Sequence, residues 1–143
     1  MFQHILIPTD GSELSRKAVV YGIRLAKQCG GKVTGLTLTE PYRIASMDAV
    51  LVSVGEDEYE EESRRLSDEA LEQVKAEAAG VAYDTIREVH DQPYRAIIDV
   101  AEGKNCDLIV MASHGRRGVS ALLLGSETNK VLTHSTIPVL VYR

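Results

Sequence analysis

The chain has 143 residues, of which 16 are Lys or Arg and 21 are Asp or Glu, so its formal net charge is −5. A chain of this length can bury a real core within one domain, and hydrophobic and charged fractions of 44% and 26% exclude a disordered or fibrous protein. The acidic balance argues against nucleic acid as a main partner, because surfaces that bind the phosphate backbone are usually basic.

The first third of the chain is expected to form two strands separated by a long helix. The apolar run Ile5–Ile7 is followed by Pro8-Thr9-Asp10-Gly11-Ser12 and predicts a buried strand that enters a tight loop. A second strand is expected over Val33–Leu38. Between them, spacings of three and four predict a helix with one apolar face, formed by Leu14, Ala18, Tyr21, Leu25 and Cys29.

The middle of the chain contains a segment without a clear pattern and then a second long helix. Pro41 ends the preceding strand, and residues 40–56 are interpreted as a loop or a short helical excursion. The pattern of Glu56–Ala79 predicts a helix whose buried stripe is Leu66, Ala70, Val74 and Ala78. The acidic run at its start is expected to be a solvated first turn, favoured by the helix dipole, and not a metal site.

The second half continues the alternation of strands and helices. The predicted elements are a strand at Thr85–Val89, a helix at Tyr94–Gly103 introduced by Pro93, a strand at Leu108–Ala112, a helix at Ser126–His134 and a strand at Val139–Tyr142. This alternation predicts one α/β domain over residues 1–143, Rossmann-like, with an open, doubly wound, five-stranded parallel sheet and helices on both faces. The strand order 3-2-1-4-5 is assumed, and the short apolar strands suggest burial on both sides.

No part of the sequence indicates a membrane or secreted protein. No apolar run reaches the roughly 18–20 residues that span a bilayer, and the first ten residues lack the basic segment of a signal peptide. The two cysteines, Cys29 and Cys106, have no CxxC partner and are expected to be buried, reduced thiols. A cytoplasmic protein with no membrane partner is therefore expected.

Two polar, glycine-containing loops are the candidates for chemistry. In open α/β sheets, ligands lie beyond the carboxyl ends of the strands where the strand order reverses. The loop Pro8–Ser12 and the loop Ser113–Gly118 would face each other there. Gly115 and Gly125 allow the backbone to approach a ligand closely, and the N–H groups of Ser126 and Glu127 at a helix start suit a phosphate. Plain roles for Asp10 as a helix cap and for Gly125-Ser126 as a helix start remain open.

Three segments of the chain resemble the universal stress proteins of the small, single-domain type. They are residues 5–12, residues 106–118, and residues 124–126 together with 137–141. ATP-binding members carry Gly, two residues, Gly, nine residues, then Gly followed by Ser or Thr. Gly115 and Gly125-Ser126 match this motif, whereas Ala112 replaces its first glycine, and the added methyl group resists a positive φ.

The resemblance implies an adenine nucleotide, ATP or AMP, with Mg²⁺ as a companion of the phosphates. Carried over residue by residue, it implies an adenine pocket lined by Pro8, Thr9 and the backbone of Leu38. It implies a ribose bordered by Met111 and Ala112, with Asp10 at the ribose or a bridging Mg²⁺, and phosphates held mainly by backbone N–H groups of Gly115, Gly125, Ser126 and Glu127. The carboxylate of Glu127 would repel a phosphate unless it points away, and Arg116 and Arg117 would offset that charge.

The implied role is a stress-response sensor or regulator with at most slow ATP hydrolysis, because no general base is evident. The resemblance also implies a homodimer through the last strand, Val139–Tyr142, whose apolar edge favours pairing. One alternative is a dimeric member that binds no nucleotide and works through unknown protein partners, which Ala112 favours. A third possibility, an ATP pyrophosphatase-like or flavin-dependent enzyme on this fold, is disfavoured because the loop Pro8–Ser12 lacks the first enzyme's signature.

Overall fold

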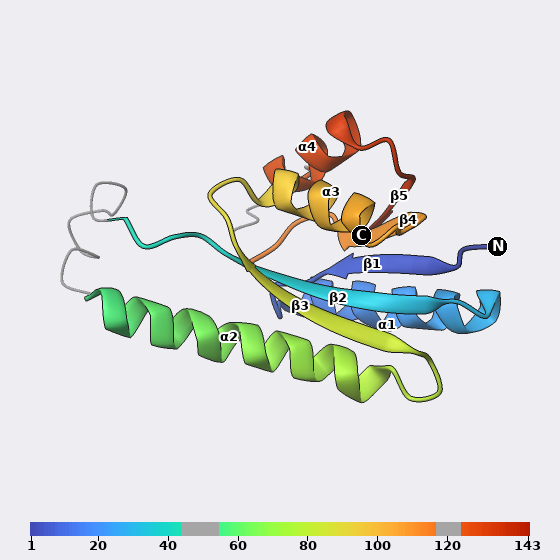
Figure 1. Cartoon of the computed structure of the whole chain (residues 1–143), viewed down its shortest axis with the longest axis horizontal. Coiled ribbons are helices and arrows are strands. Elements are labelled where there is room, and N and C mark those ends of the chain that lie inside the picture. Colours follow the sequence, from blue (N-terminus) through green and yellow to red (C-terminus); the bar gives the residue numbers. More distant parts are fainter. Residues whose placement is uncertain (44–54, 117–123) are drawn as a thin grey trace.

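The computed structural model describes residues 1–43, 55–116 and 124–143, and these residues build one five-stranded parallel sheet (Figure 1). The sheet order is β3-β2-β1-β4-β5. Along the chain the elements are β1 (His4–Pro8), α1 (Glu13–Cys29), β2 (Lys32–Thr39), α2 (Glu56–Glu77), β3 (Tyr83–Val89), α3 (Pro93–Gly103), β4 (Leu108–Ala112), α4 (Ser126–His134) and β5 (Val139–Tyr142). The predicted fold class and strand order are confirmed. Residues 44–54 and 117–123 lie outside the described residues. Most of the segment 40–56, predicted to be a loop or a short helical excursion, and the end of the predicted loop Ser113–Gly118 are therefore not described.

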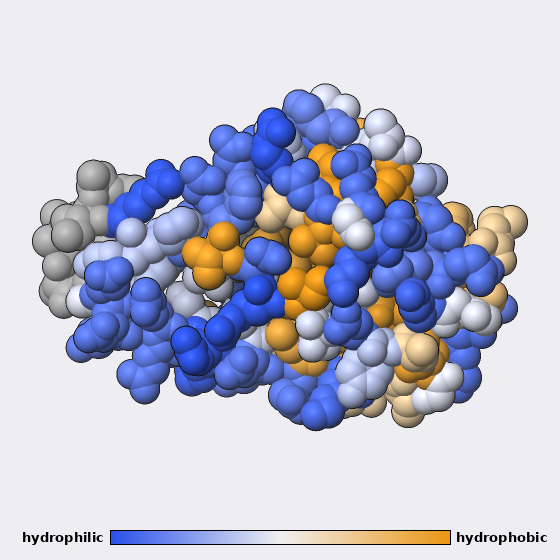
Figure 2. Space-filling view, in the orientation of Figure 1, coloured by the Kyte–Doolittle hydropathy of each residue, from blue (hydrophilic) through white to orange (hydrophobic). Residues whose placement is uncertain are grey.

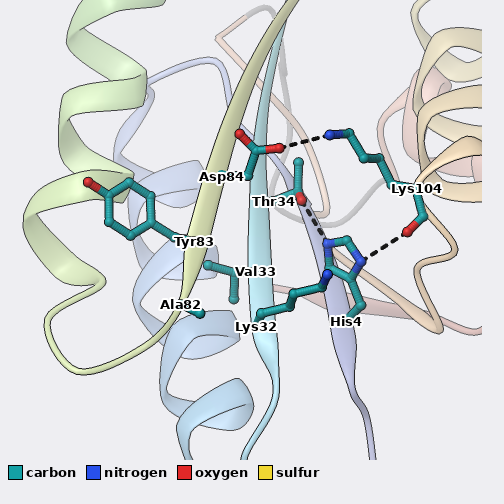
Figure 3. Close-up of a pocket in the computed structure, with 8 residues that line it drawn as sticks. All are labelled: His4, Lys32, Val33, Thr34, Ala82, Tyr83, Asp84 and Lys104. Carbon is teal, nitrogen blue, oxygen red and sulfur yellow. Dashed lines mark hydrogen bonds and ion pairs between the residues drawn. The ribbon is translucent and has the colours of Figure 1, made fainter.

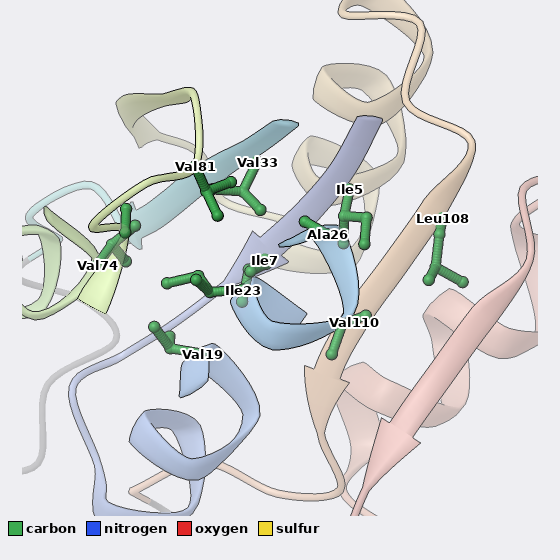
Figure 4. Packing of buried hydrophobic residues seen from close by; sticks show 11 residues of the cluster. Ile5, Ile7, Val19, Ile23, Ala26, Val33, Val74, Val81, Leu108 and Val110 are labelled. Atoms are coloured by element: carbon green, nitrogen blue, oxygen red, sulfur yellow. The ribbon is translucent and has the colours of Figure 1, made fainter. Parts of the chain in front are cut away.

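Two helices pack on each face of the sheet, and each pair covers a hydrophobic cluster. On one face, α1 and α2 enclose the first cluster, which includes Ile5, Ile7, Val19, Ile23, Val33, Val74, Leu108 and Val110 (Figure 4). On the other face, α3 and α4 enclose the second cluster, which includes Leu6, Leu36, Ile97, Ala101, Ile109, Met111 and Val131. Neighbouring residues of β4 belong to opposite clusters because successive side chains of a strand point to opposite faces.

The predicted apolar face of α1 is confirmed only in part: Ala18 is buried and Leu25 packs against the first cluster. Tyr21 is 43% exposed. The buried residues of α1 are Ser15, Ala18, Val19, Gly22, Ile23 and Ala26. A Cβ atom on Gly22 would lie 2.7 Å from Ile7 Cδ1, so glycine is what allows this close approach. The helix therefore turns Ala18, Val19, Gly22, Ile23 and Ala26 toward the sheet, and not Tyr21.

The buried stripe of α2 is confirmed over its second half. Ala70, Val74 and Ala78 are buried, and Val74 packs on Gly35, where a Cβ atom would lie 2.9 Å from both Val74 methyl groups. The acidic first turns are exposed, as predicted, and α2 is coloured mainly hydrophilic in Figure 2. Figure 1 shows these turns extending beyond the strands, and the Tyr59 hydroxyl there donates a 2.6 Å hydrogen bond to the Glu40 carbonyl.

The sheet is not buried on both sides along its whole width. The edge strand β3 is mostly exposed, and Ile86 is its only half-buried residue. Figure 2 shows apolar colour near the middle of this face, where α3 meets β2 and β3. The other edge strand, β5, has four half-buried residues. Within the described ranges, no helix is both long and apolar enough to cross a membrane.

Candidate functional site

The two loops predicted to face each other are joined by hydrogen bonds. One loop follows β1 and the other follows β4, and these strands are neighbours in the sheet. The backbone N–H of Arg116 donates to Asp10 Oδ2 at 2.8 Å, and Arg116 Nε donates to the Asp10 carbonyl at 2.9 Å. Both loops therefore meet at the carboxyl ends of β1 and β4, the place where the sequence predicts a ligand crevice, and this place is called the crevice below.

Asp10 is the most densely bonded side chain of this crevice. Besides the Arg116 N–H, its carboxylate accepts from the Ser12 N–H at 2.9 Å and from the Ser15 hydroxyl at 2.8 Å. Burial disfavours the charged form, but the hydrogen bonds from Ser12, Arg116 and Ser15 outweigh it, so the pKa of Asp10 lies below its ordinary value. Ser12 is the N-cap of α1, so Asp10 supports the start of the helix and also ties it to the β4 loop.

Pro8, Thr9 and Leu38 lie at the carboxyl ends of β1 and β2, as predicted. The Thr9 N–H donates to the Leu36 carbonyl at 2.8 Å, and the Thr9 hydroxyl accepts from the Gly11 N–H at 3.2 Å. Leu38 is half-buried and packs against the second cluster. These contacts fix the backbone of the first loop relative to the end of β2.

Ala112 ends β4 in an ordinary strand conformation. Among described residues other than glycine, only Asn105 has a positive φ, so nothing in the backbone at Ala112 demands glycine. Leu108 and Val110 point to the α1 face and Met111 to the α4 face. By this alternation the Ala112 methyl group points to the α1 face, away from the start of α4.

Gly115 and Gly125 are both required by close contacts. A Cβ atom on Gly115 would lie under 3.0 Å from Asp10 Oδ2, and one on Gly125 would lie 2.9 Å from the Ser113 carbonyl oxygen. The Gly125 N–H also donates to that carbonyl at 2.7 Å. The second loop is therefore held tightly at both ends, against the first loop and against the start of α4.

The start of α4 presents backbone donors, and the carboxylate of Glu127 points away from them. Gly125 is the N-cap and makes no side-chain cap, so the first N–H groups of α4 have no partner within the helix. Glu127 Oε2 accepts from the Tyr94 N–H at 2.9 Å, and Oε1 pairs with Lys130 at 3.2 Å. The N-cap residue of α3, Gln92, makes no side-chain hydrogen bond to that helix, and Glu127 caps it instead.

Two cavities lie away from this crevice. One, of about 260 Å³, lies at the amino ends of β1, β2 and β3 and is lined by residues that include His4, Thr34, Asp84 and Lys104 (Figure 3). His4 Nδ1 is 3.1 Å from the Lys104 carbonyl, so it carries the hydrogen, and Nε2 accepts from the Thr34 hydroxyl at 2.7 Å. The other, of about 410 Å³, is lined by parts of α1 and α2 and by Tyr142. No predicted site residue lines either cavity.

The remaining candidates have local roles. The His114 ring is hydrogen-bonded to the Ser113 hydroxyl at 3.1 Å. Burial raises the pKa of the Cys106 thiol to about 11, which makes it unreactive, and Cys29 is a half-buried free thiol. Among the residues that the structure describes, no three His, Cys, Asp or Glu side chains are arranged to hold a metal ion. Arg117 lies outside the described residues, whereas Arg116 proves more central than its sequence suggested.

Comparisons with known proteins agree on one family. The sequence model of the universal stress protein family matches residues 1–143. The universal stress protein MJ0531 of Methanocaldococcus jannaschii is 33% identical over 148 residues, covering 100% of this chain and 83% of its own. The solved structure of MJ0577 from the same organism has a TM-score of 0.81 at 29% identity, covering 99% and 96% of the two chains. A universal stress protein solved in complex with cAMP has a TM-score of 0.70 at 25% identity, covering 99% and 97%.

Proposed function

Because the chain belongs to the universal stress protein family, we propose that it binds an adenine nucleotide, ATP or AMP, in the crevice between the β1 and β4 loops. Bound there, the nucleotide would let the protein act as a sensor or regulator of a stress response, with at most slow hydrolysis. The observation that carries the proposal is the pairing of the two loops through Asp10 and Arg116, beside the backbone donors at the start of α4.

Each group of residues would contact the part of the nucleotide that lies nearest to it in the crevice. Pro8, Thr9 and Leu38 lie at the ends of β1 and β2 and would border the adenine. Met111 and Ala112 end β4 and would border the ribose. The N–H groups at the start of α4, at Ser126 and Glu127, would hold phosphate oxygens together with the glycine backbone at 115 and 125. The likeness to a protein solved with cAMP supports this class of ligand.

The geometry of Ala112 supports the proposal although the motif glycine is missing. The missing motif glycine favoured a member that had lost nucleotide binding. The methyl group, however, points to the α1 face, and α4 lies on the other. Glu127, whose charge would oppose a phosphate, is directed to α3 by its bond to the Tyr94 N–H. Neither residue blocks the phosphate side of the crevice.

A magnesium ion fits this site only as a companion of the phosphates. Asp10 already accepts three hydrogen bonds, and a carboxylate offers roughly four lone-pair sites. Within the described ranges, no cluster of acidic or imidazole ligands accompanies it. Asp10 would therefore face the Mg²⁺–phosphate group without being its main ligand, and the metal would supply charge neutralisation of the phosphates.

The proposal includes a homodimer formed through β5. Val139–Tyr142 form a half-buried edge strand with one unpaired side in the sheet, which is suited to pair with the same strand of a second copy. The proposal also places the protein in the cytoplasm, where adenine nucleotides are abundant.

Calorimetric titration of nucleotide-stripped protein with ATP–Mg²⁺ tests the proposal. We expect saturable binding near or below about 100 μM, or about −5.5 kcal/mol, that is lost in Asp10→Ala. The matched control is Asp99→Ala, which removes an exposed carboxylate on α3 and should bind as the wild type does. Heat indistinguishable from dilution up to millimolar ATP and AMP would favour the nucleotide-free, dimeric alternative.

A further inference from the structure

We infer that the side chain of Arg116 makes the crevice select adenine nucleotides by the number of their phosphate groups, so that ATP binds more tightly than AMP. This inference rests on the proposed function. Arg116 occupies one of the nine unspecified positions between Gly115 and Gly125, so the motif itself assigns it no role. In the structure, both the backbone N–H and the guanidinium of Arg116 are hydrogen-bonded to Asp10.

One hydrogen bond holds the backbone of Arg116, and the other holds its side chain through Nε. The Arg116 N–H donates to Asp10 Oδ2 at 2.8 Å, and Nε donates to the Asp10 carbonyl at 2.9 Å. Neither Nη atom has a hydrogen-bond or ion-pair partner within 1–43, 55–116 or 124–143. Nε is occupied while the two terminal amino groups keep their donors for a ligand, and a guanidinium offers these donors in a rigid, planar fork.

Gly11 provides the surface against which this guanidinium lies. Its φ is +78°, a conformation that glycine adopts without strain, and a Cβ atom there would lie 3.1 Å from Arg116 Nη2. A larger residue at position 11 would therefore displace the guanidinium as well as strain the loop. The Asp10 carbonyl thus accepts the hydrogen bond from Arg116 Nε, and Gly11 leaves room for Nη2 beside it.

The residues just before Arg116 are hydrogen-bonded to the start of α4. The Gly125 N–H is bonded to the Ser113 carbonyl at 2.7 Å, three residues before Arg116. The N–H groups that begin α4 suffice for one phosphate group. The guanidinium of Arg116, anchored on the Asp10 carbonyl, offers a further, cationic group, which only a longer and more negative phosphate chain can use fully. Glu127, the acidic neighbour at α4, forms an ion pair with Lys130 at 3.2 Å.

The test compares the affinities of ATP, ADP and AMP for the wild type, Arg116→Met and Arg116→Lys by calorimetry. Side-chain substitutions leave the backbone bond from residue 116 to Asp10 in place, so the loop pairing is expected to survive, and melting curves check this. We expect Arg116→Met to weaken ATP about tenfold or more and AMP less than about threefold, since hydrogen bonds to charged groups are strong. Arg116→Lys should keep part of the preference because it keeps the charge. Arg24→Met, an exposed arginine on α1, is the charge-matched control and should change none of the affinities.

The possible outcomes separate this inference from the function on which it rests. A wild type that binds none of the three nucleotides overturns the proposed function itself. A wild type that binds them, with Arg116→Met lowering ATP and AMP affinity by the same factor or not at all, overturns the role of Arg116 alone. A preference for ATP that disappears in Arg116→Met, and shrinks as salt concentration rises, supports it.

Discussion

Replacing Gly115 by alanine should destabilise the protein, because the new methyl group would press on the carboxylate of Asp10. A Cβ atom on Gly115 would lie 3.5 Å from Asp10 Cγ and much closer to Oδ2. The carboxylate has little freedom to retreat, since hydrogen bonds from Ser12, Ser15 and Arg116 hold it. Overpacking of this kind costs about 1–3 kcal/mol, so we expect the free energy of unfolding to fall by about 2 kcal/mol.

Urea unfolding of a double-mutant cycle isolates this contact. The cycle compares Gly115→Ala, Asp10→Ala and the double variant with the wild type. Once the carboxylate is removed, the cost of Gly115→Ala should fall below about 0.5 kcal/mol, the range within which independent substitutions add. Gly103→Ala is the control, because no atom lies within 4 Å of its Cβ position. An equal cost of Gly115→Ala with and without Asp10 would refute the reasoning.

Three further predictions follow from the same structure. Burial and the nearby Lys32 lower the pKa of His4. The unfolded chain therefore binds more protons, and the stability of the fold should decrease as the pH drops below about 6.5. His4→Gln should lose this dependence when melting is measured against pH, and an unchanged slope would contradict the prediction. Glu127→Ala removes the acceptor of the Tyr94 N–H and should cost about 1 kcal/mol in urea unfolding, whereas a neutral result would show that water replaces the cap. Ala112→Gly should change the affinity for ATP less than about threefold, because the methyl group points to the α1 face; a tenfold gain would show that it intrudes on the ligand.

The alternation of strands and helices was predictable from sequence because it depends on local patterns. Runs such as Leu108–Ala112 are apolar and bounded by turn residues, and the structure forms a strand over those same residues. The side of α1 that meets the sheet was not predictable in this way. It depends on Gly22 fitting against Ile7, a contact between residues of different elements, and periodicity alone favours the larger apolar side chains.

In the candidate site, too, local features could be predicted from the sequence, whereas contacts between distant residues could not. The glycine pattern at 115 and 125 and the loop at Asp10 stand out in the sequence. The role of Glu127 does not, because its partner is the Tyr94 N–H, 33 positions earlier in another helix. Sequence reasoning could see the charge of Glu127 near a phosphate but not the direction of its carboxylate. Arg116 was underrated for the same reason, since its two bonds reach the other loop.

The sheet order has a consequence for how the protein is made on the ribosome. The first 89 residues supply the strands β1, β2 and β3 and the helices α1 and α2, and both helices pack on the same face of these strands. Of the first cluster, only Leu108 and Val110 come later in the chain. A nascent chain can therefore assemble most of the first hydrophobic cluster early. The opposite, apolar face of its three strands stays uncovered until α3 and α4 have been made. The crevice is completed late, because Asp10 lies near the start of the chain whereas Arg116 and the start of α4 lie in its last third.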